Sequence, residues 1–175
     1  MITVDGLRFK DLNANDALDV YEDWRLPASA RAEDLVGRMT LPEKAGMMLI
    51  ATNNPDCDGS VSEDGRALIE EQNMARFILR ATATEAGADC SVTLSGFALR
   101  GGYDRTPTQL ASFTNAVQQM REASRLGIPA LFKDNARNHL EVNPTFGITQ
   151  GAGSFTEFPK EAGLAAAALG AGAEL

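Results

Sequence analysis

Hydrophobic residues recur at three- and four-residue steps in the second half of the chain. The repeating positions are Leu110, Phe113, Val117 and Met120. This spacing predicts the clearest helix of the chain, opened by Thr106-Pro107 and ended by Gly127. The apolar run Ile128–Phe132 then predicts a short buried strand. Because a helix that leads directly into a strand is half of a βαβ unit, the pattern favours an α/β fold with parallel strands.

The rest of the pattern predicts shorter elements. A weak hairpin is expected over residues 2–9, helices over 29–39, 41–49, 63–73 and 160–169, and a strand over 74–79. Ser29 is the expected cap of the first of these helices. Thr40 and Glu43 form a capping-box sequence with a proline between them, which is expected to open the second helix. Val92 and Leu94 mark a further short strand in an otherwise ambiguous segment.

Polar and charged side chains crowd the exit of the strand predicted at residues 128–132. Six of the next seven positions carry them: Lys133, Asp134, Asn135, Arg137, Asn138 and His139. Ligands of parallel α/β folds bind at the carboxyl ends of strands, where such groups converge. The segment is therefore either a ligand site or an ordinary solvated loop. The density of hydrogen-bonding groups and the only histidine of the chain favour a site.

A calcium-loop spacing lies near the amino terminus. Positions 1, 3, 5, 7, 9 and 12 of an EF-hand loop are occupied by Asp11, Asn13, Asn15, Ala17, Asp19 and Glu22. Calcium takes roughly six to eight oxygen ligands, which this set supplies with a water. Position 6 is Asp16 instead of glycine, although Asp tolerates the positive φ needed there better than most residues. The expected ion is a structural Ca²⁺; the alternative is an acidic turn that binds nothing, because no periodic helix precedes the loop.

Composition narrows the partners and the location. The chain of 175 residues carries a net charge of -8 without any basic cluster, which argues against nucleic acid and anionic membrane as partners. It has no apolar stretch of about 18 residues and no signal-peptide pattern at its start. The expected location is cytoplasmic by default, and periplasmic or secreted if the chain is processed. Cys57 and Cys90 lack metal-ligand spacing, so they are either free thiols or one bridge in an exported protein.

Three blocks of the sequence together resemble one enzyme family. They are RAEDLVGRMTLPEKAGMM (31–48), RLGIPALFKDNARNH (125–139) and GAGSFTEFPKEAGLAAA (151–167). In this order they are similar to the N-terminal domain of glycoside hydrolase family three, which includes β-glucosidases, β-xylosidases and exo-glucanases. The opening FKDLNANDALDVYEDWR (9–25) resembles the calcium-loop-like leader of some bacterial members. The resemblance spans nearly the whole chain.

The resemblance implies a (β/α) barrel that removes terminal β-linked sugars from oligosaccharides or glycosides with retention. That chemistry requires a nucleophilic and an acid/base carboxyl group about 5–5.5 Å apart. The family's nucleophile is an Asp in a Ser-Asp-Trp-like motif on a later strand, and this motif does not occur here. The family's Lys-His pair, its Arg-rich loop and the domain that supplies the acid/base Glu are absent too. No catalytic residue is therefore expected in this chain, and the isolated chain is expected to be inactive.

One sugar-binding position carries over from the family. Its members hold the outer hydroxyls of the terminal sugar with an Asp in a Gly-Ile-Asp-Ala-Val-His-like segment, and alignment on Gly-Ile-Pro brings that position to Asn135. Asn can donate to and accept from sugar hydroxyls but brings no charge, and neighbouring Asp134 could replace the lost carboxylate. Arg137 and His139 are expected to line the same rim.

Length leads to the same expectation. A closed eight-stranded barrel needs about 200–250 residues, more than remain here after a leader over residues 1–27. We therefore expect a partial (β/α) TIM-type barrel over residues 28–175, with an EF-hand-like calcium loop before it. Its expected partner is the missing C-terminal part of the enzyme or another chain. The glycine-rich run at 150–154 fits no phosphate or dinucleotide pattern, so no organic cofactor is expected. The alternatives are a non-catalytic calcium- or carbohydrate-binding module and an assembly partner whose open strand edge pairs with another chain.

Overall fold

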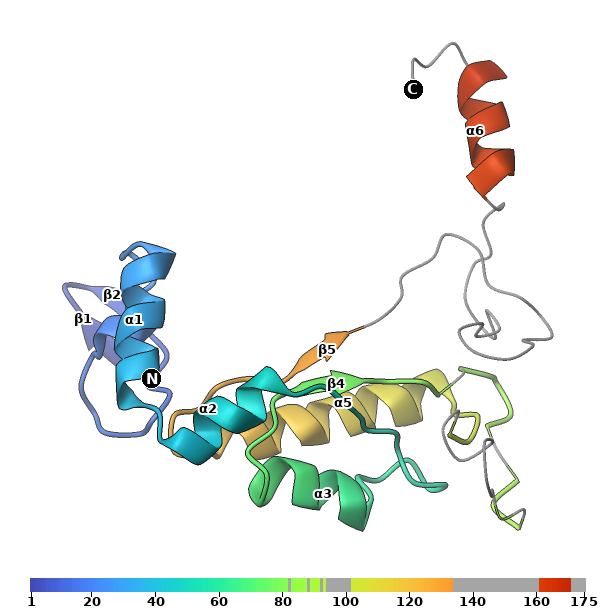
Figure 1. The fold of residues 1–175 in the computed structure, drawn as a ribbon, viewed down its shortest axis with the longest axis horizontal. Helices are drawn as coiled ribbons and strands as arrows, with labels where there is room; N and C mark the ends of the chain where they lie inside the picture. Colours follow the sequence, from blue (N-terminus) through green and yellow to red (C-terminus); the bar gives the residue numbers. More distant parts are fainter. Residues whose placement is uncertain (82, 88, 92, 94–101, 134–160, 171–175) are drawn as a thin grey trace. The chain divides into compact units, whose positions relative to one another are not determined.

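The computed structural model describes residues 1–81, 83–87, 89–91, 93, 102–133 and 161–170, which form helices and strands that alternate from α2 onward (Figure 1). The helices are the 3-10 turn η1 (Val20–Glu22), α1 (Ala28–Arg38), α2 (Leu41–Met48), α3 (Glu63–Glu70), α5 (Pro107–Glu122) and α6 (Glu161–Gly170). The strands are β1 (Ile2–Val4), β2 (Leu7–Phe9), β3 (Ala51–Thr52), β4 (Arg76–Ile78) and β5 (Leu131–Lys133). None of the helices in these described ranges is long and apolar enough to cross a membrane.

The chain divides into two compact units. Unit 1 consists of Met1–Ala51, Glu63–Phe77 and Asn115–Phe132. Unit 2 consists of Thr52–Ser62, Ile78–Thr114 and Lys133–Leu175. The boundary predicted after residue 27 stays a prediction, since unit 1 continues from the leader into α1 and α2.

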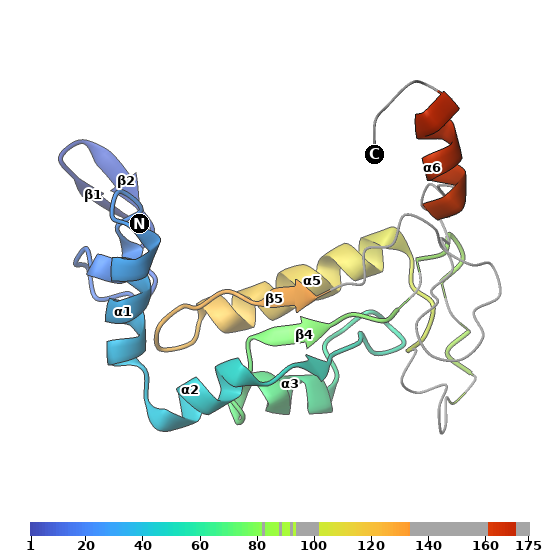
Figure 2. The same ribbon diagram turned by 45° about the horizontal axis from the view of Figure 1, so that its top comes forward.

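Strands β3, β4 and β5 form one sheet in the order β3-β4-β5. Figure 2 shows the arrows of β4 and β5 pointing in the same direction, as in a parallel sheet. Leu131 N–H donates to Ala75 O at 2.8 Å beside β4, and Asn53 N–H donates to Ile78 O at 3.1 Å at the end of β3. Parallel strands with intervening helices confirm the α/β class predicted from the sequence. The described residues close no barrel.

Unit 1 begins with the predicted hairpin. β1 and β2 pair antiparallel with Ile2 opposite Phe9, and the turn between them uses Asp5 at φ 53° and Gly6 at φ 78°. Two positive φ angles on an Asp-Gly pair are the preferred chemistry of a two-residue hairpin turn. Phe9 is buried and stacks on Trp24, with the ring centroids 5.5 Å apart. This stack holds the hairpin against the end of the leader loop.

The starts of α1 and α2 differ in how they are capped. α1 begins at Ala28, directly after the extended residue Pro27, and has no side-chain cap. The prediction that Ser29 caps it is wrong, because Ser29 already lies inside the first turn. Thr40 caps α2 as predicted: its Oγ1 accepts from Glu43 N–H at 3.4 Å, and Glu43 Oε2 accepts from Thr40 N–H at 2.7 Å.

The hydrophobic core of unit 1 collects side chains from α3, β4, the end of α5 and the loop after it. Its buried members are Ile69, Met74, Ala75, Phe77, Val117 and Leu126. Phe77 on β4 lies against Phe132 on β5, with the ring centroids 6.2 Å apart. Because side chains alternate along a strand, Leu131 points to the opposite face, where it is 59% exposed. One face of the sheet in unit 1 is therefore packed, and the other exposes an apolar residue.

The loop between α5 and β5 explains why the predicted strand is displaced. β5 begins at Leu131, three residues later than Ile128. The Gln118 side chain donates to Ala130 O at 2.9 Å and accepts from Ala130 N–H at 2.8 Å, so this amide takes the place of a neighbouring strand. Gly127 has φ 57°, and a Cβ there would overlap the Leu12 carbonyl oxygen. Glycine is therefore required where the loop passes the leader.

Candidate functional site

The sugar-binding residues predicted from the resemblance lie outside the described residues. They are Asp134, Asn135, Arg137 and His139. The described part of their segment ends at Lys133, the last residue of β5, so their roles stay predictions. The carboxyl ends of β3 and β4 lie at the same edge of the sheet, because parallel strands end together there. The site can therefore be built from the residues that follow these two strands.

Polar side chains lie within two residues of the ends of β3 and β4 in unit 2. Asn54 Oδ1 accepts from Arg80 N–H at 2.8 Å, and Arg80 Nε donates to Thr52 Oγ1 at 3.2 Å. These bonds hold both the backbone and the side chain of Arg80 against the end of β3. Within the described ranges its guanidinium makes no other hydrogen bond, so its terminal nitrogens can donate to an oxygen-rich ligand.

Asn53, the first residue after β3, carries an unsatisfied amide. The residue is 2% exposed, and neither Oδ1 nor Nδ2 has a hydrogen-bond partner among the described residues. Buried polar atoms are nearly always paired, and an orphaned one costs about 1–3 kcal/mol. An amide can both donate to and accept from a hydroxyl group, which makes Asn53 a fitting contact for a sugar.

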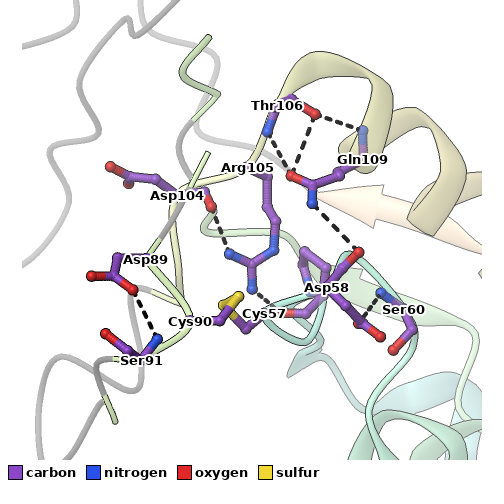
Figure 3. Close-up of a disulfide and its surroundings, with 11 residues drawn as sticks. Cys57, Asp58, Ser60, Asp89, Cys90, Ser91, Asp104, Arg105, Thr106 and Gln109 are labelled. Atoms are coloured by element: carbon purple, nitrogen blue, oxygen red, sulfur yellow. Dashed lines mark hydrogen bonds between the residues drawn. A yellow bond between two sulfur atoms is a disulfide. The ribbon is translucent and has the colours of Figure 1, made fainter. Parts of the chain in front are cut away.

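A disulfide joins the loops that follow β3 and β4 (Figure 3). Cys57 and Cys90 are bonded with their Cα atoms 5.6 Å apart, across a sequence separation of 33. Of the two alternatives that the sequence left open, the structure contains the bridge and no free thiol. The bridge fixes the two loops that extend the carboxyl edge of β3 and β4.

Arg105 lies beside this bridge and is fully buried (Figure 3). Its Nη2 donates to Pro55 O at 2.9 Å and its Nη1 to Asp104 O at 2.6 Å, while Nε is unpaired among the described residues. The guanidinium carbon is 5.0 Å from the centroid of the Tyr103 ring. Burial lowers the pKa of Arg105, and the charge of Asp56 opposes that shift. Arg105 therefore links the loop after β3 to the segment that opens α5.

Sequence reasoning did not select Asn53, Arg80 or Arg105. The rule that singled out the segment after residue 132, polar residues close to the end of a strand, also selects Asn53, one residue after β3, and Arg80, two residues after β4, once the strand ends are known. Arg105 has no such signal, because its burial comes from contacts between loops that are distant in sequence.

The leader loop from Asp11 to Glu22 has, at its sixth position, the positive φ angle that calcium loops have there. Asp16, at loop position 6, has φ 61°, the positive value that the sequence analysis expected an Asp to tolerate. Asp11 accepts from the backbone N–H groups of Asn15 at 3.1 Å and Asp16 at 3.0 Å. The loop therefore folds around the carboxylate of its first residue.

Two further carboxylates of the loop, those of Glu22 and Asp19, accept hydrogen bonds from its own donors. Glu22 accepts from Leu12 N–H at 2.6 Å and from Asp19 N–H at 3.1 Å. Asp19 Oδ2 accepts from the amide nitrogens of Asn13 and Asn15 at 2.7 and 3.0 Å. In the part of the chain that the structure describes, no three carboxylate, imidazole or thiol groups gather so as to hold a metal ion. The oxygen-rich donor set suits calcium, but the geometry is that of a self-bonded loop, so calcium binding stays a prediction.

Comparison with known proteins relates the chain to β-glucosidases, which are glycoside hydrolases. It is 41% identical to the Periplasmic beta-glucosidase/beta-xylosidase of Dickeya chrysanthemi over 166 residues, which are 95% of this chain and 23% of that protein. It is 30% identical to Beta-glucosidase C of Emericella nidulans over 158 residues, 89% of this chain and 22% of that protein. It is 28% identical to Probable beta-glucosidase C of Aspergillus oryzae over 87% of this chain and 21% of that protein. No family model matches the chain.

These relatives confirm the resemblance that the three sequence blocks indicated. The chain is a homologue of one part of the β-glucosidases and spans less than a quarter of the length of the relatives it matches.

Proposed function

We propose that the chain forms part of the catalytic domain of a retaining β-glycosidase and contributes loops that hold the terminal β-linked sugar. The observation that carries this proposal is the 41% identity, over 95% of the chain, to a β-glucosidase/β-xylosidase. The substrate class is accordingly a β-glucoside or a β-xyloside. The nucleophile and the acid/base belong to polypeptide outside these 175 residues.

A partial TIM-type barrel is the fold that we propose for this part. In unit 1 the sheet buries Phe77 on one face and exposes Leu131 on the other, whereas parallel sheets are normally covered on both faces. β3 and β5 are the edge strands of the described sheet, and edge strands leave backbone groups unpaired. Further strands and helices of a barrel would cover that face and pair those edges.

The sugar site that we propose combines two sets of residues at one sheet edge. The residues after β5 are Asp134, Asn135, Arg137 and His139. The orphaned amide of Asn53 and the braced guanidinium of Arg80 support a polar site at this edge, because sugars offer many hydroxyl groups that both donate and accept. The disulfide between Cys57 and Cys90 supports a rigid rim around them.

The test combines this chain with the part of the Dickeya relative that lies outside the matched 166 residues. Neither polypeptide alone should hydrolyse a chromogenic β-glucoside or β-xyloside, and the mixture should do so. Asp134→Ala and Asn135→Ala should lower kcat/KM by about 10–100-fold, the effect of losing one or two hydrogen bonds to the sugar. Asp64→Ala, on the exposed surface of α3, is the matched control and should leave kcat/KM unchanged.

Two outcomes would count against the proposal. Hydrolysis that survives substitution of Asp134, Asn135 and His139 would remove the sugar-binding role of this rim. A mixture that is inactive, together with no detectable sugar binding by the chain, would favour the alternative of an assembly partner.

We propose separately that the leader loop binds one structural Ca²⁺ through Asp11, Asn13, Asn15, Ala17, Asp19 and Glu22. The positive φ of Asp16 supports it, because that conformation is the one calcium loops require at position 6. Arg38 competes for the site, since its Nη2 lies 2.8 Å from Asp19 Oδ1. Millimolar Ca²⁺ should raise the melting temperature, and Mg²⁺ should not. A rise that persists in Asp11→Ala/Glu22→Ala would refute the assignment.

We also propose that the protein works in an oxidising compartment outside the cytoplasm. The Cys57–Cys90 bridge supports export, because disulfides persist in oxidising compartments and are rare in the cytosol. The relative from Dickeya chrysanthemi is named as periplasmic. Alkylation of thiols during extraction from the native cells should leave both cysteines unlabelled, whereas labelling of both would place the protein in a reducing compartment.

A further inference from the structure

A cavity of about 420 Å³ lies in unit 1 among α2, α3, the end of α5 and the residues that follow it. Most of its wall is apolar, formed by Met39, Met47, Ile69, Met120, Leu126 and Ile128. Its volume falls within the range of small-molecule sites, about 300–1,000 Å³. None of these residues belongs to the sugar rim or the leader loop described above, so the cavity needs a separate explanation.

Four charged side chains also line the cavity, and three of them already have ionic partners. Arg125 forms a two-point pair with Glu43, at 2.5 Å from Nη2 to Oε2 and 3.1 Å from Nε to Oε1. Glu70 lies 3.9 Å from Nη1 of Arg66, which is outside the cavity. Arg121 is the fourth, and it has no carboxylate partner among the described residues.

Arg121 is also the most deeply buried of these charges. It is 4% exposed, and within the described ranges its guanidinium makes one hydrogen bond, from Nε to Ile128 O at 3.3 Å. Burial lowers the pKa of Arg121, and the charge of Glu43, a carboxylate that is already bonded to Arg125, opposes that shift. Its place in the last turn of α5 is favourable for a cation, because the unpaired carbonyl groups at the carboxyl end of a helix carry partial negative charge. That interaction does not occupy the terminal nitrogens, and a buried charge without a directly bonded anion is costly.

We propose that this cavity binds an organic monocarboxylate, whose carboxylate pairs with Arg121 and whose apolar body lies against the methionines. The planar guanidinium matches a carboxylate with two parallel hydrogen bonds. Methionine side chains adapt to apolar bodies of different shape. An inorganic anion would leave the apolar wall unused, and a neutral apolar molecule would leave Arg121 unpaired. The site does not depend on the glycosidase proposal.

The methionines provide the readout. Three of the six in the chain line the cavity, Met39, Met47 and Met120, whereas Met1, Met48 and Met74 do not. In the full chain labelled with ¹³C at the methionine methyl groups, titration with hexanoate should shift the first three signals saturably and leave the other three in place. Hexan-1-ol, with the same apolar body and no charge, should bind at least tenfold more weakly.

Matched variants identify the charge responsible. Arg121→Met should raise the Kd for hexanoate about 10–100-fold, the loss expected for charge-assisted hydrogen bonds. Arg8→Met, which removes an exposed arginine of β2 that does not line the cavity, should change the Kd less than twofold. Equal binding of hexanoate and hexan-1-ol, no saturable shift, or an unchanged Kd in Arg121→Met would overturn the proposal. The comparison of the two ligands on the unaltered chain decides the matter if Arg121→Met does not fold.

Discussion

Removing the Cys57–Cys90 bridge should destabilise the chain by an amount that its sequence separation of 33 determines. In Cys57→Ser/Cys90→Ser the unfolded chain regains the freedom that the bridge takes away. The loop-closure relation gives about 12.5 cal/mol/K for a loop of this length, or about 4 kcal/mol at 25 °C. Removal of native bridges typically costs about 2–5 kcal/mol, so the expected loss lies within the usual range.

The assay is urea unfolding of the oxidised chain, the reduced chain and the double serine variant. For a chain of this size the dependence of unfolding free energy on urea is about 2 kcal/mol per molar, so the midpoint should fall by about 2 M. The reduced chain should match the serine variant. The serine variant should not respond to reductant, which controls for other effects of the reagent.

Two results would refute this reasoning. Two free thiols per chain after denaturation without reductant would mean that the bridge does not form. A midpoint that falls by less than about 0.5 M would mean that the loops stay ordered without it. In that case the buried Arg105, through its bond to Pro55 O, would be the main link between these segments.

Three further substitutions, one of them with a matched control, test individual contacts. Arg125 lowers the pKa of Glu43 to about 2, below its value in the unfolded chain. The pair therefore contributes its full stabilisation above about pH 4.5, and this contribution is lost as the pH falls towards 2. Because Arg125 is half exposed, the expected contribution is only about 1–2 kcal/mol, and Glu43→Gln should flatten the pH dependence of urea midpoints in this window. Gly127→Ala should lower the unfolding free energy by more than about 2 kcal/mol, because residue 127 has a positive φ and a Cβ there would overlap the leader. Its control is Gly37→Ala on α1, where a Cβ meets nothing, and this change should raise the unfolding free energy by up to about 1 kcal/mol. Equal effects of the two substitutions would contradict this reasoning. Asn53→Leu should raise the unfolding free energy by about 1–2 kcal/mol while weakening sugar binding, and a destabilised variant would mean that its amide is paired.

Local signals predicted the helices well. Thr40 and Glu43 are only three residues apart in sequence, so their capping box could be recognised without any tertiary information. α5 follows from the spacing of its apolar residues, although it ends at Glu122 and not at Gly127. The error at Ser29 arose because several residues near a helix start can serve as the cap, and the extended conformation of Pro27 decides the choice.

Non-local contacts account for what the sequence did not predict. β5 starts at Leu131 because the Gln118 side chain, twelve residues before Ala130, bonds both backbone groups of Ala130. The bridge between Cys57 and Cys90 depends on two loops meeting, which composition alone left undecided. The burial of Arg121 likewise depends on α2, α3 and the end of α5 meeting around one cavity. Such contacts leave no periodic pattern in the sequence from which they could be predicted.

The rule that selected the segment after β5 applies equally to β3 and β4. There it selects Asn53 and Arg80, whose environments the structure describes. A buried amide without a partner among the described residues is a cost that folding alone does not explain, because a leucine, with the same branched heavy-atom shape, would remove it. A hydroxyl-rich ligand or a further barrel segment would explain it, and the two differ in their consequences. If a barrel segment pairs with Asn53, Asn53→Leu weakens assembly with the remaining polypeptide; if a sugar does, assembly is unchanged and KM rises.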